Sequence, residues 1–545
     1  MQKAKHKVIF HLVIGALLML IYPWESLFSG NQNVYFLWAA AKSGFGHLTA
    51  DPLLNQTDPY PAFTLLAGLI FKALPVSFFQ AVYWLLNSVY SFSLFGITDR
   101  FTGIYSGIRS IVLFTVLFLV FHSTQLWGTF FETATGADLR WIWDSGLAEQ
   151  GLLRGYLQPS VLGVFLLLGV YHLIQENHWK AAIAFGIAGA FHANYLALEL
   201  IALGLFASYS LVKRSLTFDL IKPMLLWLIM TLPYLYYVVT HFLGGSSEGV
   251  QNEVLNHFSD HIHFDPTTWL NAKTAIQLIA FGIFLSMFRK QAFGKWFIVI
   301  TGVTILLSVL AFTIPGTPLL SLTPWRVSVV LFPIAFSILI GLISQSLRPG
   351  RYVQLAILPF SALLVSLIYF RIMGSGNPEF MLTWRLITAV FILMAFVVGW
   401  FSRKMERPFQ IQLNNTAALG LVFLLIFSGI LGKWTEFRTR SNFPWENVRA
   451  FVQTNAKDGE LYMVPPEMLG FRMNAGVAVF SDQLLVHGAT LSDQYQRQSI
   501  TKEFYSTGVL KSEAAVSHAI VPNGSFDNLG TSIYSDEHYT VIKLD

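Results

Sequence analysis

The chain alternates long apolar runs with short polar segments from Met1 to about Gly432. Its first run, VIFHLVIGALLMLIY, directly follows the basic head MQKAKHK. These runs are continuous and rich in Leu, Phe and Ile, and most approach the roughly 17–25 residues that a helix needs to cross a bilayer. Only helices and closed barrels satisfy backbone polar groups in lipid, and barrel strands would alternate in polarity. The pattern therefore predicts an all-α polytopic membrane bundle.

Counting the runs predicts about thirteen transmembrane helices, near residues 8–24, 77–97, 108–123, 157–175, 180–193, 195–212, 222–242, 272–288, 296–314, 325–344, 352–371, 385–401 and 415–432. The composition agrees, because 54% of the residues are hydrophobic and only 12% are charged, against about 25% charged residues in soluble domains. The first run lacks a small-residue cleavage site, so we interpret it as a retained helix, with a cleaved signal as the alternative.

Charge along the loops predicts the orientation. Lys and Arg gather in alternate short loops, whereas the other loops, 25–60, 124–156 and 243–271, are longer and acidic. Because short cytoplasmic loops are enriched in Lys and Arg, we expect a multi-pass protein of the bacterial inner membrane with its N-terminus in the cytoplasm and its C-terminus outside. The basic residues are dispersed, so the net charge of +5 does not indicate nucleic acid. The absence of cysteine excludes disulfides and cysteine-based chemistry.

The composition changes after the last run. Residues 1–432 form the expected transmembrane domain, and residues 433–545 are an ordinary polar sequence, long enough for one small domain. Within it, PWENVRAFVQTNA and LSDQYQRQSITKEFY have helical patterns, and ELYMV, VAVF, HAIVP and YTVIKL have strand patterns. This alternation predicts a small extracytoplasmic α/β domain.

Two carboxylates in the first acidic loop are candidate catalytic groups. Asp51 and Asp58 lie in LTADPLLNQTDPYPAF, directly before a new apolar run. Partial burial at the membrane surface would raise the pKa of such a carboxyl and suit it to act as a general base. The alternative is structural, because Asp before Pro commonly forms turns and caps helices.

Two arginines at expected outer helix ends are candidates for binding a lipid phosphate. Arg154 stands in AEQGLLRGYLQPS, near Glu149, and Arg326 follows a tryptophan in LTPWR. A guanidinium at this depth can neutralise a phosphate. It can equally reach lipid headgroups, and Arg154 can pair with Glu149.

Histidines supply the remaining polar candidates. His257 and His263 lie in HFSDHIHFDP, a pattern that can ligate a divalent cation. No third set of ligands with a recognised spacing follows, so a metal site is not assigned. His192 lies inside an apolar stretch, where it either faces a substrate cavity or packs through a hydrogen bond.

The last candidate lies in the C-terminal domain. MVPPEMLGFR predicts a rigid loop after a strand, and this loop would present Phe471 and Arg472 to a sugar and a phosphate. The alternative is an ordinary junction in which Arg472 is solvated.

Several segments resemble a family of bacterial polytopic membrane proteins with a C-terminal extracytoplasmic domain. They are NQNVYFLW, LTADPLLNQTDPYPAF, LQPSVLG, AFHANYLAL, HFSDHIHFDPTTW, LTPWRVS and PWENVRAFVQTNAKDGELYMVPPEMLGFR. The layout in turn resembles the GT-C fold of glycosyltransferases that use polyprenyl-phosphate sugars. That resemblance implies a catalytic acid at Asp51 or Asp58 and a lipid-phosphate site at Arg154 or Arg326. The chain departs from it at PWESLFSGNQN, where only Glu25 stands in place of the Asp or Asp-Glu pair of many such enzymes.

These observations together predict a membrane glycosyltransferase of GT-C type. Its expected partners are a polyprenyl-phosphate lipid donor, the surrounding membrane lipids, and an extracytoplasmic glycan or protein acceptor. The alternative is a non-catalytic membrane subunit, or a transporter or binding protein for lipid-linked glycans, in which the same arginines only hold the lipid.

Overall fold

The computed structural model describes residues 2–22, 27–130, 132, 138–212, 218–242, 266, 269–314, 322–346, 422–430, 444–481, 491–511, 514–526 and 529–544. The predicted spans 352–371 and 385–401, most of the loop 243–271, and the candidates His257 and His263 lie outside these residues.

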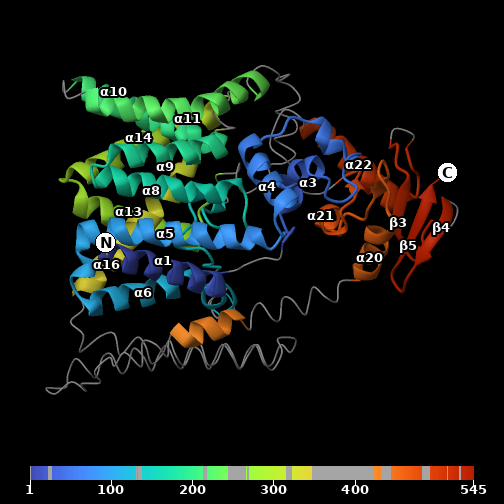
Figure 1. Cartoon of the computed structure of the whole chain (residues 1–545), viewed down its shortest axis with the longest axis horizontal. Helices are drawn as coiled ribbons and strands as arrows, with labels where there is room; N and C mark the ends of the chain where they lie inside the picture. The colour runs from blue at the N-terminus through green and yellow to red at the C-terminus, as the bar shows by residue number, and fades with distance from the viewer. Residues whose placement is uncertain are drawn as a thin grey trace.

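Apolar helices form a bundle wherever the structure describes the predicted spans (Figure 1). They are α1 (Gln2–Ile21), α5 (Phe78–Thr102), α6 (Ile108–His122), α8 (Val164–Ile174), α9 (His178–Phe191), α10 (Ala193–Val212), α11 (Phe218–Phe242), α13 (Ala272–Phe288), α14 (Ala292–Thr313) and α16 (Ser328–Ser346), and residues 422–430 are also helical. Helix α5 packs against α1, α8 and α16, and much of the largest apolar core lies there.

Length and apolar composition make three described helices long enough to cross a membrane, at 219–241, 292–313 and 324–345. Six further apolar helices are shorter. On α11 and α14, large apolar side chains point outward: Ile229 is 67% exposed and Ile305 is 60% exposed. Continuous apolar surface of this kind is suited to lipid rather than water. The chain is a membrane protein with a mostly helical fold, and about thirteen spans remains a prediction.

The polar C-terminal sequence forms a mixed sheet flanked by helices, called here the C-terminal α/β region. Helices α20 (Glu446–Asn455), α21 (Phe471–Ala475) and α22 (Leu491–Thr507) accompany strands β1 (Leu461–Met463), β2 (Ala478–Val479), β3 (His518–Pro522), β4 (Gly530–Ser535) and β5 (Tyr539–Leu544). The strand order is β2-β1-β3-β5-β4. Strand β1 runs parallel to β2 and β3, while β5 is antiparallel to β3 and β4.

Two of these elements differ from the sequence-based expectation. The predicted loop at MVPPEMLGFR runs into the short helix α21, whose first residues are Phe471 and Arg472. Strand β4 is not predicted from the sequence, because GTSIYS has few apolar residues. It lies at the edge of the sheet with mostly exposed side chains. Because neither face of the strand is buried, its sequence does not alternate between apolar and polar residues.

The C-terminal α/β region lies against one end of the bundle, called here the docking end (Figure 1). The N-terminus lies at the opposite end. Between the bundle and the region stand helices α2 (Gln32–Tyr35), α3 (Leu37–Lys42), η1 (Pro52–Asn55) and α4 (Pro61–Ala73), all from the segment after α1. His47 forms a parallel β-bridge with Val477. Its N–H donates to the Gly476 carbonyl at 2.6 Å, and the Ala478 N–H donates to the His47 carbonyl at 3.1 Å.

This bridge requires a glycine at position 46. Gly46 has a φ of +67°, and a Cβ there would lie 2.4 Å from the Gly476 carbonyl oxygen. We predict that Gly46→Ala opens the interface, because backbone atoms cannot move away as a flexible side chain can. Gly44 is the matched control, since its φ is +71° and a Cβ there would meet no described atom within 4 Å. Hydrogen exchange at residues 477–479 should accelerate in Gly46→Ala and not in Gly44→Ala; equal exchange in the two variants would contradict the close approach.

Candidate functional site

The docking end gathers polar and aromatic side chains from four elements around Arg326. Helices α9 and α10 meet at His192, whose backbone is extended. Arg326 lies on η7 (Pro324–Val327), which precedes α16, and the Asn194 Nδ2–H donates to Thr323 Oγ1 at 2.5 Å. The turn before α4 supplies Tyr60. Segments far apart in sequence therefore meet at one place, called here the Arg326 cluster (Tyr35, Tyr60, His192, Tyr195 and Arg326).

Arg326 is half-buried, and its guanidinium carbon lies 5.6 Å from the centre of the Tyr195 ring. Its Nε atom is buried and has no hydrogen-bond partner among the described residues. Burial raises the pKa of the Tyr35 and Tyr60 phenols, and the Arg326 cation opposes that rise in both. A guanidinium with a free N–H beside phenol hydroxyls is a set of donors suited to an anion.

Aromatic rings form a continuous wall beside this cation. The ring centres of Tyr35 and Tyr60 are 5.1 Å apart, those of Tyr60 and His192 are 5.2 Å apart, and those of His192 and Tyr195 are 4.7 Å apart. Tyr35 and Tyr60 are partly exposed. His192 therefore belongs to the cluster, whereas the sequence did not distinguish this position from simple packing.

Asp58 lies two residues before Tyr60 and is buried. Its Oδ1 accepts the Tyr60 N–H at 2.9 Å, which is the turn geometry expected as the structural alternative. Its Oδ2 is buried without a hydrogen-bond partner in the described structure, 3.9 Å from Lys42 Nζ. Burial raises the pKa of Asp58, and the hydrogen bond from Tyr60 opposes this only partly. One carboxylate oxygen is thus held by the backbone, and the other is buried near Lys42 and Thr64.

Helix α11 holds the Asp58 turn from the other side. The Tyr237 hydroxyl donates to the Asp58 carbonyl at 2.7 Å, and the Tyr234 hydroxyl donates to the Pro59 carbonyl at 3.0 Å. The backbone that carries Asp58 is therefore fixed to a helix of the bundle.

Asp51 lies in a different environment. Its side chain is fully buried, and it caps η1 by accepting the Leu53 N–H at 3.0 Å. Its Oδ2 accepts from Arg472 Nε at 2.6 Å and from the Val479 N–H at 3.0 Å. Both carboxylate oxygens are thus used by donors of the protein itself, and this geometry favours the helix-cap role over that of a general base.

Arg472 fits neither the loop-presented role nor the solvated junction expected for MVPPEMLGFR. Its side chain is 1% exposed, so it is neither presented on an open loop nor solvated. Phe471 is 1% exposed as well. The physical reason is α21, which buries Phe471 in the core of the C-terminal region and Arg472 against Asp51. Burying a guanidinium requires such a partner.

Glu149 and Arg154 lie close in sequence but have separate partners. Glu149 Oε1 is 3.2 Å from Nζ of Lys273 on α13, so the expected Glu149–Arg154 pair is replaced by a bond to a different helix. The Arg154 guanidinium carbon lies 5.1 Å from the centre of the Trp141 ring, and its carbonyl accepts from the Tyr83 hydroxyl. Both residues have positive φ, 53° and 54°, as does Thr323 before η7. Strain of this kind is typical of functional segments.

Asp144 is a buried carboxyl that sequence reasoning missed. It is 0% exposed, and its Oδ2 accepts from the Tyr22 hydroxyl at 2.5 Å. Burial raises its pKa to about 6, although Tyr22 and Arg154 oppose the rise. Nothing in WIWDSG marks this position, because an aspartate before Ser-Gly also suits an exposed turn.

The raised pKa predicts a pH dependence of stability. A carboxyl with a pKa of about 6 in the folded protein and 3.8 when unfolded stabilises the fold fully below pH 3.8 and loses that contribution as pH rises through 6. The free energy of unfolding should therefore lose about 3 kcal/mol over this interval. Denaturant titrations of wild type and Asp144→Asn in micelles test this. The variant should lack the loss, and an unchanged pH profile would show that Asp144 is not its source.

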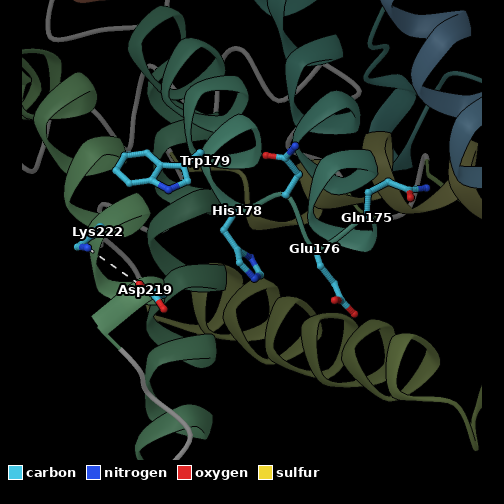
Figure 2. A pocket seen from close by; sticks show the side chains of 7 residues that line it. Gln175, Glu176, His178, Trp179, Asp219 and Lys222 are labelled. Carbon is cyan, nitrogen blue, oxygen red and sulfur yellow. Dashed lines mark ion pairs between the residues drawn. The ribbon is translucent and has the colours of Figure 1, made fainter. Parts of the chain in front are cut away.

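No three His, Asp or Glu side chains gather as a metal site within the described residues. A surface pocket, lined by residues 175–179, Asp219 and Lys222, lies away from the Arg326 cluster, at the opposite end of α9 from His192. Figure 2 shows it between the turn carrying Glu176 and His178 and the start of α11, where Asp219 Oδ1 lies 4.0 Å from Lys222 Nζ. None of the candidate residues lines this pocket.

Solved structures that resemble this chain include two of ArnT. No protein-family model matches the chain, and no curated protein matches it. A crystal structure of ArnT from Cupriavidus metallidurans bound to undecaprenyl phosphate is 13% identical, with a TM-score of 0.45, covering 99% of this chain and 98% of that chain. The apo structure of the same protein is 12% identical, with a TM-score of 0.47 and coverage of 99% and 97%. Likeness at this level identifies neither substrate nor residues.

Proposed function

We propose that this protein is a membrane glycosyltransferase of GT-C type, transferring a sugar from a polyprenyl-phosphate donor to an extracytoplasmic acceptor. The observation that carries the proposal is Arg326, a half-buried cation with a free Nε–H, among the described residues, at the end of an apolar bundle. An isolated charge at such a position is costly unless it has a counter-charge. A lipid phosphate supplies one, with its polyprenyl chain in the membrane beside the bundle.

The remaining residues of the cluster suit the sugar. Tyr35 and Tyr60 are partly exposed, and their rings pack against each other beside the expected phosphate position. Aromatic side chains combine an apolar face with a polar tip, which matches the alternating C–H and hydroxyl surface of a pyranose. His192 completes the wall next to Tyr60.

The reaction proposed is a direct displacement at the anomeric carbon. Asp58 accepts the proton of the acceptor hydroxyl on Oδ2, and the acceptor oxygen then bonds to the anomeric carbon. The bond from that carbon to the phosphate oxygen breaks, and the polyprenyl monophosphate leaves with the electron pair. Arg326 stabilises the charge that develops on the leaving phosphate. The anomeric configuration is inverted because attack and departure occur on opposite faces.

We further propose that the docking end faces the outside of the inner membrane. The N-terminus and the C-terminal α/β region lie at opposite ends of the bundle (Figure 1), which supports the orientation expected from the loop charges. Reporter fusions after Gln291, in the turn between α13 and α14, and after Asp545 should report cytoplasmic and extracytoplasmic locations, respectively. The same compartment for both fusions would contradict the orientation.

Ligand binding tests the proposal before any turnover is measured. The purified chain in nanodiscs should be stabilised against heat by a polyprenyl monophosphate, and much less by the neutral polyprenol or by inorganic phosphate. The difference arises because the proposed site needs both the anion and the membrane-embedded chain. Equal stabilisation by polyprenol and its phosphate would remove the role given to Arg326.

A further inference from the structure

The C-terminal α/β region contacts the Asp58 loop on both sides of η1. Asp51 precedes η1 and is bound by Arg472 and by the Val479 N–H. Gln56 follows η1 and is bound by Asp493 and Gln494 on α22. We propose that this region positions the Asp58 loop (residues 51–60). Its positioning residues are Arg472 on α21 and Asp493 and Gln494 on α22. The inference rests on the proposed function only in giving Asp58 a catalytic role.

The first contact joins residues 421 positions apart in the sequence. The Asp51 and Arg472 side chains are 0% and 1% exposed, so solvent does not screen their interaction. Asp51 Oδ1 simultaneously accepts the Leu53 N–H, which fixes the first turn of η1. Because a buried charge is very unfavourable without its partner, removing Arg472 should release Asp51 from the interface and loosen the start of η1.

The second contact is polar and only partly buried. Gln56 Nε2–H donates to Asp493 Oδ2 at 3.0 Å, and Gln494 Nε2–H donates to Gln56 Oε1 at 3.1 Å. The Gln56 amide thus uses both its donor and its acceptor on one helix of the C-terminal region. Arg497 is 3.0 Å from the same Asp493 carboxylate and helps to hold it.

Both contacts act on the segment that carries the proposed base. Asp58 follows Gln56 by two residues and Tyr60 follows it by four, so a shift of η1 moves both through a short, proline-containing stretch. Tyr234 and Tyr237 fix the far end of this stretch to the bundle. The loop between η1 and α4 is therefore held between α11 on one side and the C-terminal region on the other.

Hydrogen exchange of the full chain in nanodiscs tests the positioning directly and does not depend on the reaction. In Arg472→Met and in Gln56→Ala, exchange at residues 53–60 should accelerate on the order of tenfold, while α5 and α8 stay protected. Gln56→Ala keeps the test usable if Arg472→Met fails to fold. Asp458→Asn is the control, since its ion pair with His47 lies in the same interface but is exposed; it should leave exchange unchanged.

An engineered crosslink separates positioning from other effects of Arg472. The chain has no cysteine, and the bridged pair His47 and Val477 has the spacing of neighbouring strands, about 5 Å, within disulfide range. In the Arg472→Met background, oxidation of His47→Cys with Val477→Cys should return the exchange of residues 53–60 toward wild type, and reduction should reverse it.

Two results would overturn the inference: wild-type exchange at residues 53–60 in folded Arg472→Met and Gln56→Ala, or accelerated exchange that the formed crosslink does not restore. Failure of the proposed function has a different signature. If the variants exchange as expected but wild type transfers no sugar, the positioning stands and the glycosyltransferase assignment fails.

Discussion

Replacing Arg326 by alanine is expected to weaken the binding of a polyprenyl monophosphate by about 10- to 150-fold. The variant loses a charge-assisted contact worth about 1.5–3 kcal/mol. Arg326→Lys should fall between alanine and wild type, because an ammonium keeps the charge but not the planar fork of donors. Titration of the lipid phosphate into nanodiscs that hold the purified chain measures the affinity.

The control for this prediction is Arg140→Ala. Arg140 lies in the second predicted outer loop and already has a partner, since its Nη2 is 2.7 Å from Asp138 Oδ2. Its removal changes the net charge by the same amount but should leave the affinity within about twofold. Equal losses in Arg140→Ala and Arg326→Ala would mean that general charge, rather than the Arg326 cluster, attracts the lipid.

The second large effect is expected from Asp58→Asn, which should reduce turnover by roughly 10²–10⁴-fold and leave donor affinity nearly unchanged. The amide keeps the size of the side chain and can still accept the Tyr60 N–H, but it cannot take up the acceptor proton. Because burial raises the pKa of Asp58, wild-type turnover should rise with pH through a point above the ordinary carboxyl range. The turnover of Asp58→Asn should not show this rise with pH.

Asp138→Asn is the matched carboxylate control. Asp138 lies in a predicted outer loop and is paired with Arg140, whereas Asp58 is bonded to the N–H of Tyr60, a member of the Arg326 cluster. Its replacement should change turnover by less than about twofold. If Asp58→Asn behaves in the same way as Asp138→Asn, Asp58 is only a turn former.

Continuous apolar runs were sufficient to predict the helices of the bundle that the structure describes. The ranges expected for α5, α11 and α13 each end within a few residues of the observed helices, because an apolar run of membrane length has few alternative structures. The same reasoning predicted α20 and strand β3 in the polar C-terminal sequence. It failed at α21, whose five residues are too few to show a helical period.

The sequence predicted the types of polar residue in the site better than their partners. Arg326 and His192 belong to the Arg326 cluster, and Asp58 lies two residues before Tyr60 of that cluster. Asp51 instead pairs with Arg472, which lies 421 positions away. Neither residue shows from its neighbours that it will be buried. Partner choice across such a separation depends on how the C-terminal region docks, which no local pattern encodes.

The tyrosines show the other limit of sequence reasoning. Tyr35, Tyr60 and Tyr195 each stand in an aromatic-rich stretch where an interfacial membrane anchor is the ordinary interpretation. Only their convergence on Arg326 separates them from the other tyrosines of the chain. A search for aromatic residues next to each predicted span would have included Tyr195 but not Tyr35 or Tyr60, which lie between the spans predicted at 8–24 and 77–97.

The central claim is that the Arg326 cluster transfers a sugar rather than only holding a lipid. Its most direct test is a single-turnover measurement with purified chain, a polyprenyl-phosphate sugar labelled in the sugar, and cell-envelope glycans and proteins as acceptors. We expect the label to move to an acceptor as polyprenyl monophosphate is released, and Asp58→Asn to bind the donor without transferring it. Donor that stays bound and intact on the wild-type chain with every acceptor would contradict the claim and favour a lipid-linked-glycan binding protein or transporter.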